Sequence, residues 1–155
     1  MEYIQANKDS VSDGCVFCAL LAGEGSEDER ILRRGERAFV TLAKFPYNPG
    51  HLLVLPTRHV GELEELTPEE NADVATLLQR SVGALRGASD PHGFNVGLNL
   101  GRVAGAGIPE HLHWHVVPRW GGDTNFMPVV GQTRVLPELL VETYEKLAPF
   151  FAGEA

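Results

Sequence analysis

The sequence has few cysteines, few basic residues and no long apolar run, and each shortage excludes a class of protein. Its only cysteines, Cys15 and Cys18, are too close together for the disulfide framework of a small secreted domain. No run of about 18 apolar residues is present, so we expect no membrane-spanning helix. The 13 Lys and Arg residues are outnumbered by 21 Asp and Glu, and the net charge of −8 argues against binding to the nucleic-acid backbone.

The chain of 155 residues has the length of one ordinary domain, and its 43% of apolar residues is sufficient for a packed core. Residues 1–14 are polar and lack the apolar core of a signal peptide, which predicts a flexible leader and a cytoplasmic protein. We expect a single domain over residues 15–150 and a short tail over residues 151–155.

Apolar periodicity and turn residues predict an α+β fold. The clearest element is a helix capped by Thr67, with Pro68 in its first turn, Glu70 completing a capping box, and an end near residues 87–91. Further elements are expected as a hairpin over residues 29–44, strands over 51–56, 94–100 and 111–118, and a last helix over about 137–147. This order predicts an antiparallel sheet of about five strands, one long helix and a C-terminal helix.

Three of the six histidines alternate with apolar residues in the predicted strand over residues 111–118. Because alternate residues of a strand share a face, His111, His113 and His115 should line one face while Leu112 and Trp114 pack on the other. A neutral imidazole is a nucleophile toward phosphorus near pH 7, provided that its other nitrogen donates to a fixed acceptor. Histidines on a strand are also common metal ligands, so both chemistries fit this pattern.

The segment HLHWHVV, residues 111–117, resembles the signature His-φ-His-φ-His-φ-φ of the histidine-triad (HIT) family, in which φ is apolar. The segments FPYNPGHLLVLP, GFNVGLNLG and HVVPRWGGDTNF are similar to its bacterial diadenosine-tetraphosphate phosphorylase-like branch. The likeness runs from about Cys15 to the last helix. It implies the HIT-like fold and an enzyme that cleaves nucleoside polyphosphates or nucleoside phosphoramidates through a nucleotidyl-histidine intermediate, by hydrolysis or phosphorolysis.

The resemblance also implies a role for each matching residue. His113 would be the nucleophile, His115 would donate to the phosphate or the leaving group, and His51 would complete the histidine cluster. The substrate-binding positions would be Asn99 by its side chain, Gly107 and Ile108 by their backbone N–H groups, and His113 and His115. The family further implies a homodimer, for which Leu112 and Trp114, opposite the histidines, are candidate contact residues.

The pair Cys15-x-x-Cys18 alone is a weak zinc motif, because two ligands do not close a tetrahedral site. Two ordinary thiols or a redox pair fit the same spacing. Some HIT members bind zinc through such a pair and two histidines, and the resemblance assigns those positions to His59 and His111. It therefore implies a structural zinc ion, with no cofactor needed for catalysis.

Two other functions are compatible with the sequence. One is a nucleotide-binding regulatory module with little turnover. The other is a metallohydrolase whose ligands are the three histidines, although Glu110 is the only acidic residue beside them. The sequence also departs from the family at two positions: Gly107 stands where fragile-histidine-triad hydrolases carry Gln, and Ala43 stands where many members carry Asn or Asp for the ribose hydroxyls.

We predict that Ala43 makes binding at the site insensitive to whether the nucleotide carries ribose or deoxyribose. The expected loss of ribose hydrogen bonds weakens binding by about two- to more than a hundredfold, the range for one neutral to one charged hydrogen bond. Wild-type protein should bind adenosine and 2′-deoxyadenosine monophosphate about equally, and Ala43→Asn should prefer the ribonucleotide. A strong ribose preference already present with Ala43 would show that Lys44 or a backbone group reads the hydroxyls instead.

Overall fold

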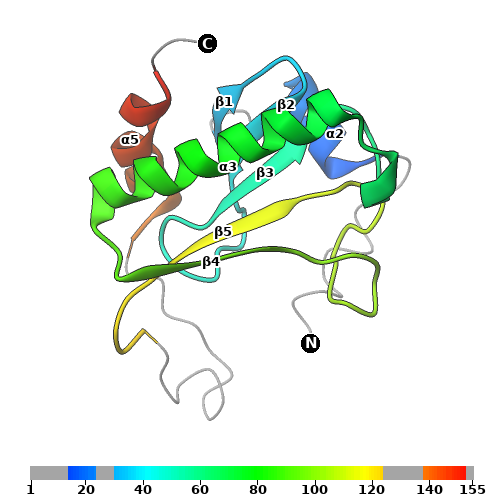
Figure 1. The fold of residues 1–155 in the computed structure, drawn as a ribbon. Helices are drawn as coiled ribbons and strands as arrows, with labels where there is room; N and C mark the ends of the chain where they lie inside the picture. The colour runs from blue at the N-terminus through cyan, green and yellow to red at the C-terminus, as the bar shows by residue number, and fades with distance from the viewer. Residues whose placement is uncertain (1–13, 24–29, 124–137, 153–155) are drawn as a thin grey trace.

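The computed structural model describes residues 14–23, 30–123 and 138–152. Within these ranges the chain forms a five-stranded antiparallel sheet with strand order β1-β2-β3-β5-β4 (Figure 1). The elements are α2 (Val16–Ala22), β1 (Ile31–Arg34), β2 (Ala38–Leu42), β3 (Leu52–Pro56), η2 (Leu63–Glu65), α3 (Pro68–Ser89), β4 (Gly93–Leu98), β5 (Trp114–Arg119) and α5 (Leu140–Phe151). The predicted α+β class, with five strands, one long helix and a C-terminal helix, is confirmed. The predicted leader lies outside the described residues except for Gly14.

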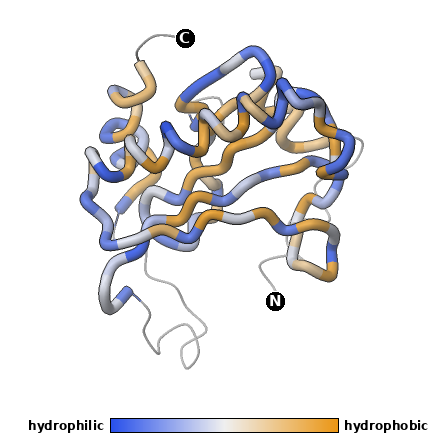
Figure 2. The backbone as a smooth tube through the Cα atoms, viewed as in Figure 1, coloured by the Kyte–Doolittle hydropathy of each residue, from blue (hydrophilic) through white to orange (hydrophobic). Residues whose placement is uncertain are grey.

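The central strands are buried on both faces of the sheet, which appears as an apolar band in Figure 2. Val40 and Val54 point to the core shared with α3 and α5, and Phe39 and Leu55 point to a second core shared with α2. Side chains alternate between the faces of a strand, so helices on both sides explain why β2 and β3 are apolar throughout. The two cores place α2 and α3 on opposite faces of the sheet.

The long helix α3 begins where the sequence predicts. The side chain of Thr67 accepts a hydrogen bond from Glu70 N at 3.2 Å, and the carboxylate of Glu70 accepts one from Thr67 N at 2.9 Å, which completes the capping box. The helix ends at Ser89, followed by Asp90 in the left-handed conformation with φ of 44°. Neither α3 nor any other helix in the described ranges is long and apolar enough to cross a membrane.

The predicted strand over residues 111–118 is wrong at its start, because β5 begins at Trp114. The neighbouring strand β3 runs only from Leu52 to Pro56, and its pairing with β5 ends at Val54 opposite Trp114. Leu112 N instead donates to Val60 O at 2.8 Å, in the segment that follows β3. His111 and His113 therefore lie in the segment before the strand and not in the strand itself.

Two helices also differ from the prediction. The short α2 was not predicted; it contains Cys18 and ends at Gly23, which adopts a φ of 76°. The last helix spans Leu140–Phe151 and not residues 137–147, of which residue 137 lies outside the described ranges. This helix continues through Pro149 because Leu147 and Phe151 bury their side chains, each 2% exposed, against α3 and the sheet.

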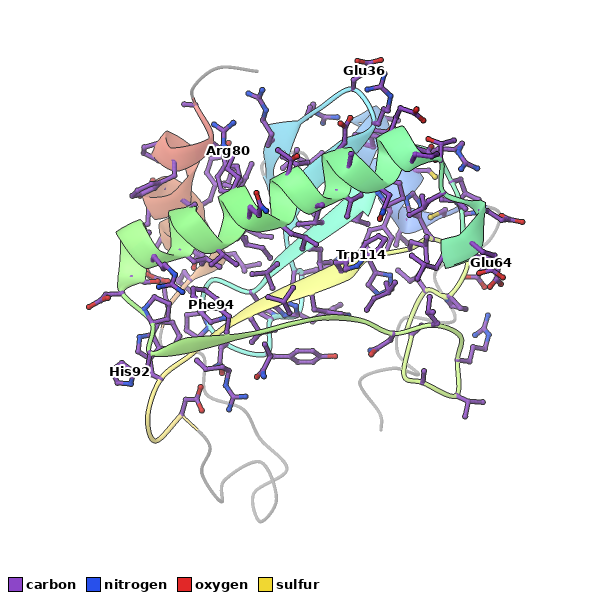
Figure 3. All side chains as sticks on the ribbon, in the orientation of Figure 1. Glu36, Glu64, Arg80, His92, Phe94 and Trp114 are labelled. Atoms are coloured by element: carbon purple, nitrogen blue, oxygen red, sulfur yellow. The ribbon has the colours of Figure 1, made fainter. Side chains whose placement is uncertain are left out.

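Leu112 and Trp114, the candidate dimer residues opposite the histidines, both contribute to packing within the chain. Trp114 packs against the core beneath α3 (Figure 3), and Leu112 is 2% exposed. Leu112 is thus covered within the chain and Trp114 partly so, and the expected dimer contact through these two residues stays a prediction.

Glu70 should stabilise the start of α3 in a pH-dependent way. Its carboxylate accepts two hydrogen bonds from Arg58, each 2.8 Å long, and these together with Thr67 lower the pKa of Glu70 to about 2. The stabilisation is complete above the ordinary pKa of a glutamate and is lost as the pH falls toward about 2. Glu70→Gln should lower the free energy of unfolding at neutral pH by about 1–2 kcal/mol.

Urea unfolding at pH 7 and at about pH 3 tests this, since the difference between wild type and Glu70→Gln should shrink at the lower pH. Glu69→Gln, an exposed neighbour in the same helical turn, serves as the control and should change stability little. A difference between wild type and Glu70→Gln that does not depend on pH would contradict the assignment.

Candidate active site and metal centre

His113 and His115 lie on the face of the sheet that carries α2. Their ring centroids are 5.2 Å apart, and the ring of Phe17 from α2 lies 5.2 Å from that of His113. The predicted common face of these two histidines is confirmed. His113 is buried, with 6% of its surface exposed, whereas His115 is partly exposed.

A backbone carbonyl determines the tautomer of His113. Its Nδ1 lies 2.8 Å from the carbonyl oxygen of His111, which can only accept, so Nδ1 carries the proton and donates. Burial lowers the pKa of His113, which keeps the ring neutral near pH 7. Nε2 of His113 therefore presents a lone pair, as a nucleophilic imidazole requires.

A second chain of hydrogen bonds determines the tautomer of His115. The backbone N–H of Tyr47 donates to Nδ1 of His51 at 3.1 Å, which leaves the proton of neutral His51 on Nε2. That Nε2–H donates to Nδ1 of His115 at 2.9 Å, and His115 in turn carries its proton on Nε2. Burial and the neighbouring His113 lower the pKa of His115 to about 4. His115 is thus a neutral ring with an N–H donor beside the lone pair of His113.

The first histidine of the row belongs to a different cluster. Nδ1 of His111 lies 3.4 Å from Sγ of Cys15 and 3.6 Å from Sγ of Cys18, and Nδ1 of His59 lies 3.5 Å from Sγ of Cys18. All four candidate ligand atoms lie within 4.8 Å of one another. The structure therefore brings together the four residues proposed to bind zinc, and His111 is one of them.

The cluster fits a tetrahedral zinc ion. Zinc–sulfur and zinc–nitrogen bonds of about 2.0–2.3 Å place neighbouring ligands about 3.5 Å apart, close to the observed separations. Nε2 of His111 donates to the carbonyl of Pro56 at 2.9 Å, so its Nδ1 presents a lone pair to the two thiols. Burial and the neighbouring Cys15 raise the pKa of Cys18 to about 11. A bound cation would supply the charge that converts these thiols to thiolates.

The predicted phosphate-binding loop follows β4. Asn99 is half-buried, and its side-chain nitrogen would lie 3.6 Å from a Cβ on Gly105, so the amide and the loop are neighbours. Ile108 packs against the core on the α2 face, whereas Gly107 is exposed. The structure thus holds the end of this loop on the face that carries the histidines.

Sequence and structural comparisons identify the protein family. A family model described as the HIT domain matches residues 24–122. The chain belongs to the HIT family. An AP-4-A phosphorylase from Mycobacterium tuberculosis (strain H37Rv) is 48% identical over 128 residues, which cover 83% of this chain and 66% of that protein. The chain thus spans slightly less than two thirds of this relative's length.

Further relatives are more distant. An adenosine 5′-monophosphoramidase from Schizosaccharomyces pombe is 30% identical over 105 residues, covering 68% of this chain and 74% of the relative. A crystal structure of a Zn-bound histidine triad family protein from Mycobacterium smegmatis has a TM-score of 0.74 and 29% identity, covering 90% of this chain and 94% of that one. The five-stranded sheet and its helices are accordingly the HIT fold.

The structure contains ring and hydrogen-bond contacts that the sequence analysis did not predict. Phe17 contacts one residue of the candidate metal cluster and the candidate nucleophile, with its ring 5.6 Å from that of His111 and 5.2 Å from that of His113. Tyr47 stacks on the ring of His51. His92 lies at the opposite end of the β4–β5 pair from Trp114 (Figure 3), where its Nδ1 accepts a hydrogen bond from Gly121 N at 2.8 Å. The sequence gives no signal for such contacts, because they join segments that are far apart in the chain and come together only on folding.

Ala43 is the position at which many family members carry a ribose-binding side chain. It follows β2 and is 4% exposed, in the core on the α2 face. Its N–H donates to the carbonyl of His51 at 3.0 Å. A longer side chain at position 43 would therefore begin in the core on the α2 face, next to the backbone of His51.

We predict one zinc ion per chain, bound by Cys15, Cys18, His59 and His111. Elemental analysis of protein purified without a chelator should give near one zinc per chain, and chelation should lower the melting temperature because metal affinity contributes to folding. Cys15→Ser should lose the metal and much of this stability. His113→Asn is the control and should retain the metal. Protein that contains no metal after purification without a chelator would contradict the assignment.

Proposed function

We propose that this HIT protein is a nucleotidyl hydrolase or transferase in which His113 attacks the phosphorus of a nucleoside polyphosphate. The observation that carries the proposal is the pair of fixed tautomers: a lone pair on Nε2 of buried His113 beside an N–H on His115. The activities named for two relatives, AP-4-A phosphorylase and adenosine 5′-monophosphoramidase, support nucleotide cleavage as the reaction class.

The reaction would proceed in two displacements. Nε2 of His113 forms a bond to phosphorus while the bond to the leaving phosphate or amine breaks, which gives a nucleotidyl-histidine. Water or inorganic phosphate then attacks the same phosphorus and returns the electron pair to Nε2. Water yields a nucleoside monophosphate, and phosphate yields a nucleoside diphosphate.

The remaining residues would stabilise charge and hold geometry. The carbonyl of His111 accepts from Nδ1–H of His113 and would stabilise the positive charge that the ring acquires on attack. Nε2–H of His115 would donate to a phosphate oxygen or to the leaving group, with His51 holding its tautomer. Asn99 and the N–H groups of Gly107 and Ile108 would bind the remaining phosphate oxygens.

The metal, when bound, would be structural. It would connect the start of α2 to the segment before β5, because Cys15 precedes α2, Cys18 lies in it, and His111 lies in that segment. In this assignment the catalytic histidines and the metal ligands are different residues. A metallohydrolase would need all three triad histidines on one ion, whereas Nδ1 of His111 faces Cys15 and Cys18.

Product analysis distinguishes hydrolysis from phosphorolysis. We would incubate the protein with diadenosine tetraphosphate and with an adenosine phosphoramidate, each with and without inorganic phosphate, and identify the nucleotides by chromatography. Phosphate-dependent release of ADP supports the phosphorylase reaction, and AMP in both conditions supports hydrolysis. No turnover of either substrate would contradict the enzyme and favour a nucleotide-binding module.

Replacing the nucleophile should abolish turnover. His113→Asn should fold and bind nucleotide but lose several orders of magnitude in kcat, as expected for loss of a covalent nucleophile. His92→Asn, which changes an exposed histidine outside the site, is the control and should keep wild-type activity. More than about a tenth of wild-type activity in His113→Asn would contradict covalent catalysis by this residue.

We also propose a homodimer, formed through the exposed edge of the sheet. In the described residues β4 is the edge strand next to β5; Val96 within it is 48% exposed, and Leu100 shortly after it is 45% exposed. An unprotected edge with exposed apolar residues is suited to a symmetric contact with a second copy. Light scattering at micromolar concentration should give twice the 16.9 kDa mass of the chain, and Val96→Lys should give the monomer mass. A monomeric wild type would contradict this proposal.

A further inference from the structure

The ring of Tyr47 covers the hydrogen-bonded pair of His51 and His115. Its centroid lies 4.8 Å from that of His51 with an angle of 20° between the planes, and 5.8 Å from that of His115 with an angle of 26°. The two imidazoles are themselves 5.1 Å apart and share the 2.9 Å bond between Nε2 and Nδ1. One aromatic face thus spans both partners of this bond.

The loop that carries Tyr47 is held by contacts that do not involve its ring. The side-chain nitrogen of Asn48 donates to the carbonyl of Pro118 at 2.9 Å and to Asp123 at 2.8 Å. Gly50 adopts a φ of 81°, and a Cβ there would lie 2.9 Å from Leu85, so the turn requires glycine. Removal of the ring should therefore leave the loop and the Tyr47 N–H donor in place.

The exposure of Tyr47 also argues against a mainly structural role. The residue is 46% exposed and belongs to neither of the two core clusters described above. Its clearest ring contacts in the described residues are the two imidazoles of the site. An offset aromatic stack at these separations restricts rotation of the stacked rings and shields their hydrogen bond from water.

We propose that Tyr47 is a positioning residue, whose ring holds His51 and His115 in the orientation that directs Nε2–H of His115 toward the substrate. The proposal rests on the proposed function of His115 as the donor. Among the described residues, the ring of His115 is held by the hydrogen bond that its Nδ1 accepts from His51, and the plane of the ring could otherwise tilt about that bond. Stacking removes this freedom without adding a charged or hydrogen-bonding group.

Steady-state kinetics on Tyr47→Ala, Tyr47→Phe and Phe45→Ala test the proposal. Tyr47→Ala should lower kcat by about three- to tenfold, the effect of losing one aromatic stack, with little change in KM. Tyr47→Phe keeps the stack and should restore kcat. Phe45 is a similarly exposed aromatic residue in the same loop, at 41%, and Phe45→Ala should keep the wild-type kcat. An equal loss in Phe45→Ala, or no rescue by Phe, would overturn the role of the stack.

A second readout does not depend on turnover. Two-bond ¹H–¹⁵N correlation spectra report which ring nitrogen of each histidine carries the proton. His115 should be the Nε2–H tautomer in wild type and Tyr47→Phe. In Tyr47→Ala water competes for the unshielded bond between His51 and His115, so His115 should be a mixture of tautomers, whereas His51 should keep its proton on Nε2 because its Nδ1 still accepts from the backbone N–H of residue 47. A single, unchanged tautomer in Tyr47→Ala together with wild-type kcat would overturn the proposal. If wild type itself shows no turnover, the proposed function fails, and the spectra still decide whether Tyr47 positions His115.

Discussion

The hydrogen bond from Nδ1–H of His113 to the carbonyl of His111 is the constraint on which the site depends. The carbonyl fixes the tautomer of His113, and the ring of the same His111 donates to Pro56 and faces Cys15 and Cys18. The side chain of His111 is therefore held by its bond to Pro56, while its backbone carbonyl fixes the tautomer of His113. His111 thus joins the candidate metal cluster to the proposed nucleophile through two hydrogen bonds, one accepted by its backbone carbonyl and one donated by its ring.

The proposed chemistry also requires neutral imidazoles, and burial of the histidines beside the sheet meets this requirement. Burial is the largest cause that lowers the pKa of His111, His113 and His115. A protonated ring has no lone pair, so neither nucleophilic attack nor metal binding is possible in that form. The α2 helix contributes to this burial through Phe17, whose ring contacts both His111 and His113. The short helix α2 thus helps to keep His111 and His113 neutral.

Elements governed by neighbouring residues could be predicted from the sequence, and elements governed by distant ones could not. The start of α3 follows from Thr67 and Glu70, which bond to each other. The start of β5 depends on where β3 ends and on Val60, more than fifty residues earlier in the chain. The four candidate metal ligands were found by resemblance to a family, because their spacing along the chain carries little signal. The stack of Tyr47 on two histidines had no sequence signal at all.

The stereochemical course at the attacked phosphorus tests the central claim, covalent catalysis by His113, most directly. Each in-line displacement inverts the configuration at phosphorus, so two displacements through a nucleotidyl-histidine restore it. The substrate would be a dinucleoside polyphosphate made chiral at the attacked phosphorus with sulfur and oxygen isotopes, and the configuration of the nucleotide product would be measured by phosphorus NMR. The account predicts retention of configuration. Inversion would show that water or phosphate attacks the substrate directly and would contradict it.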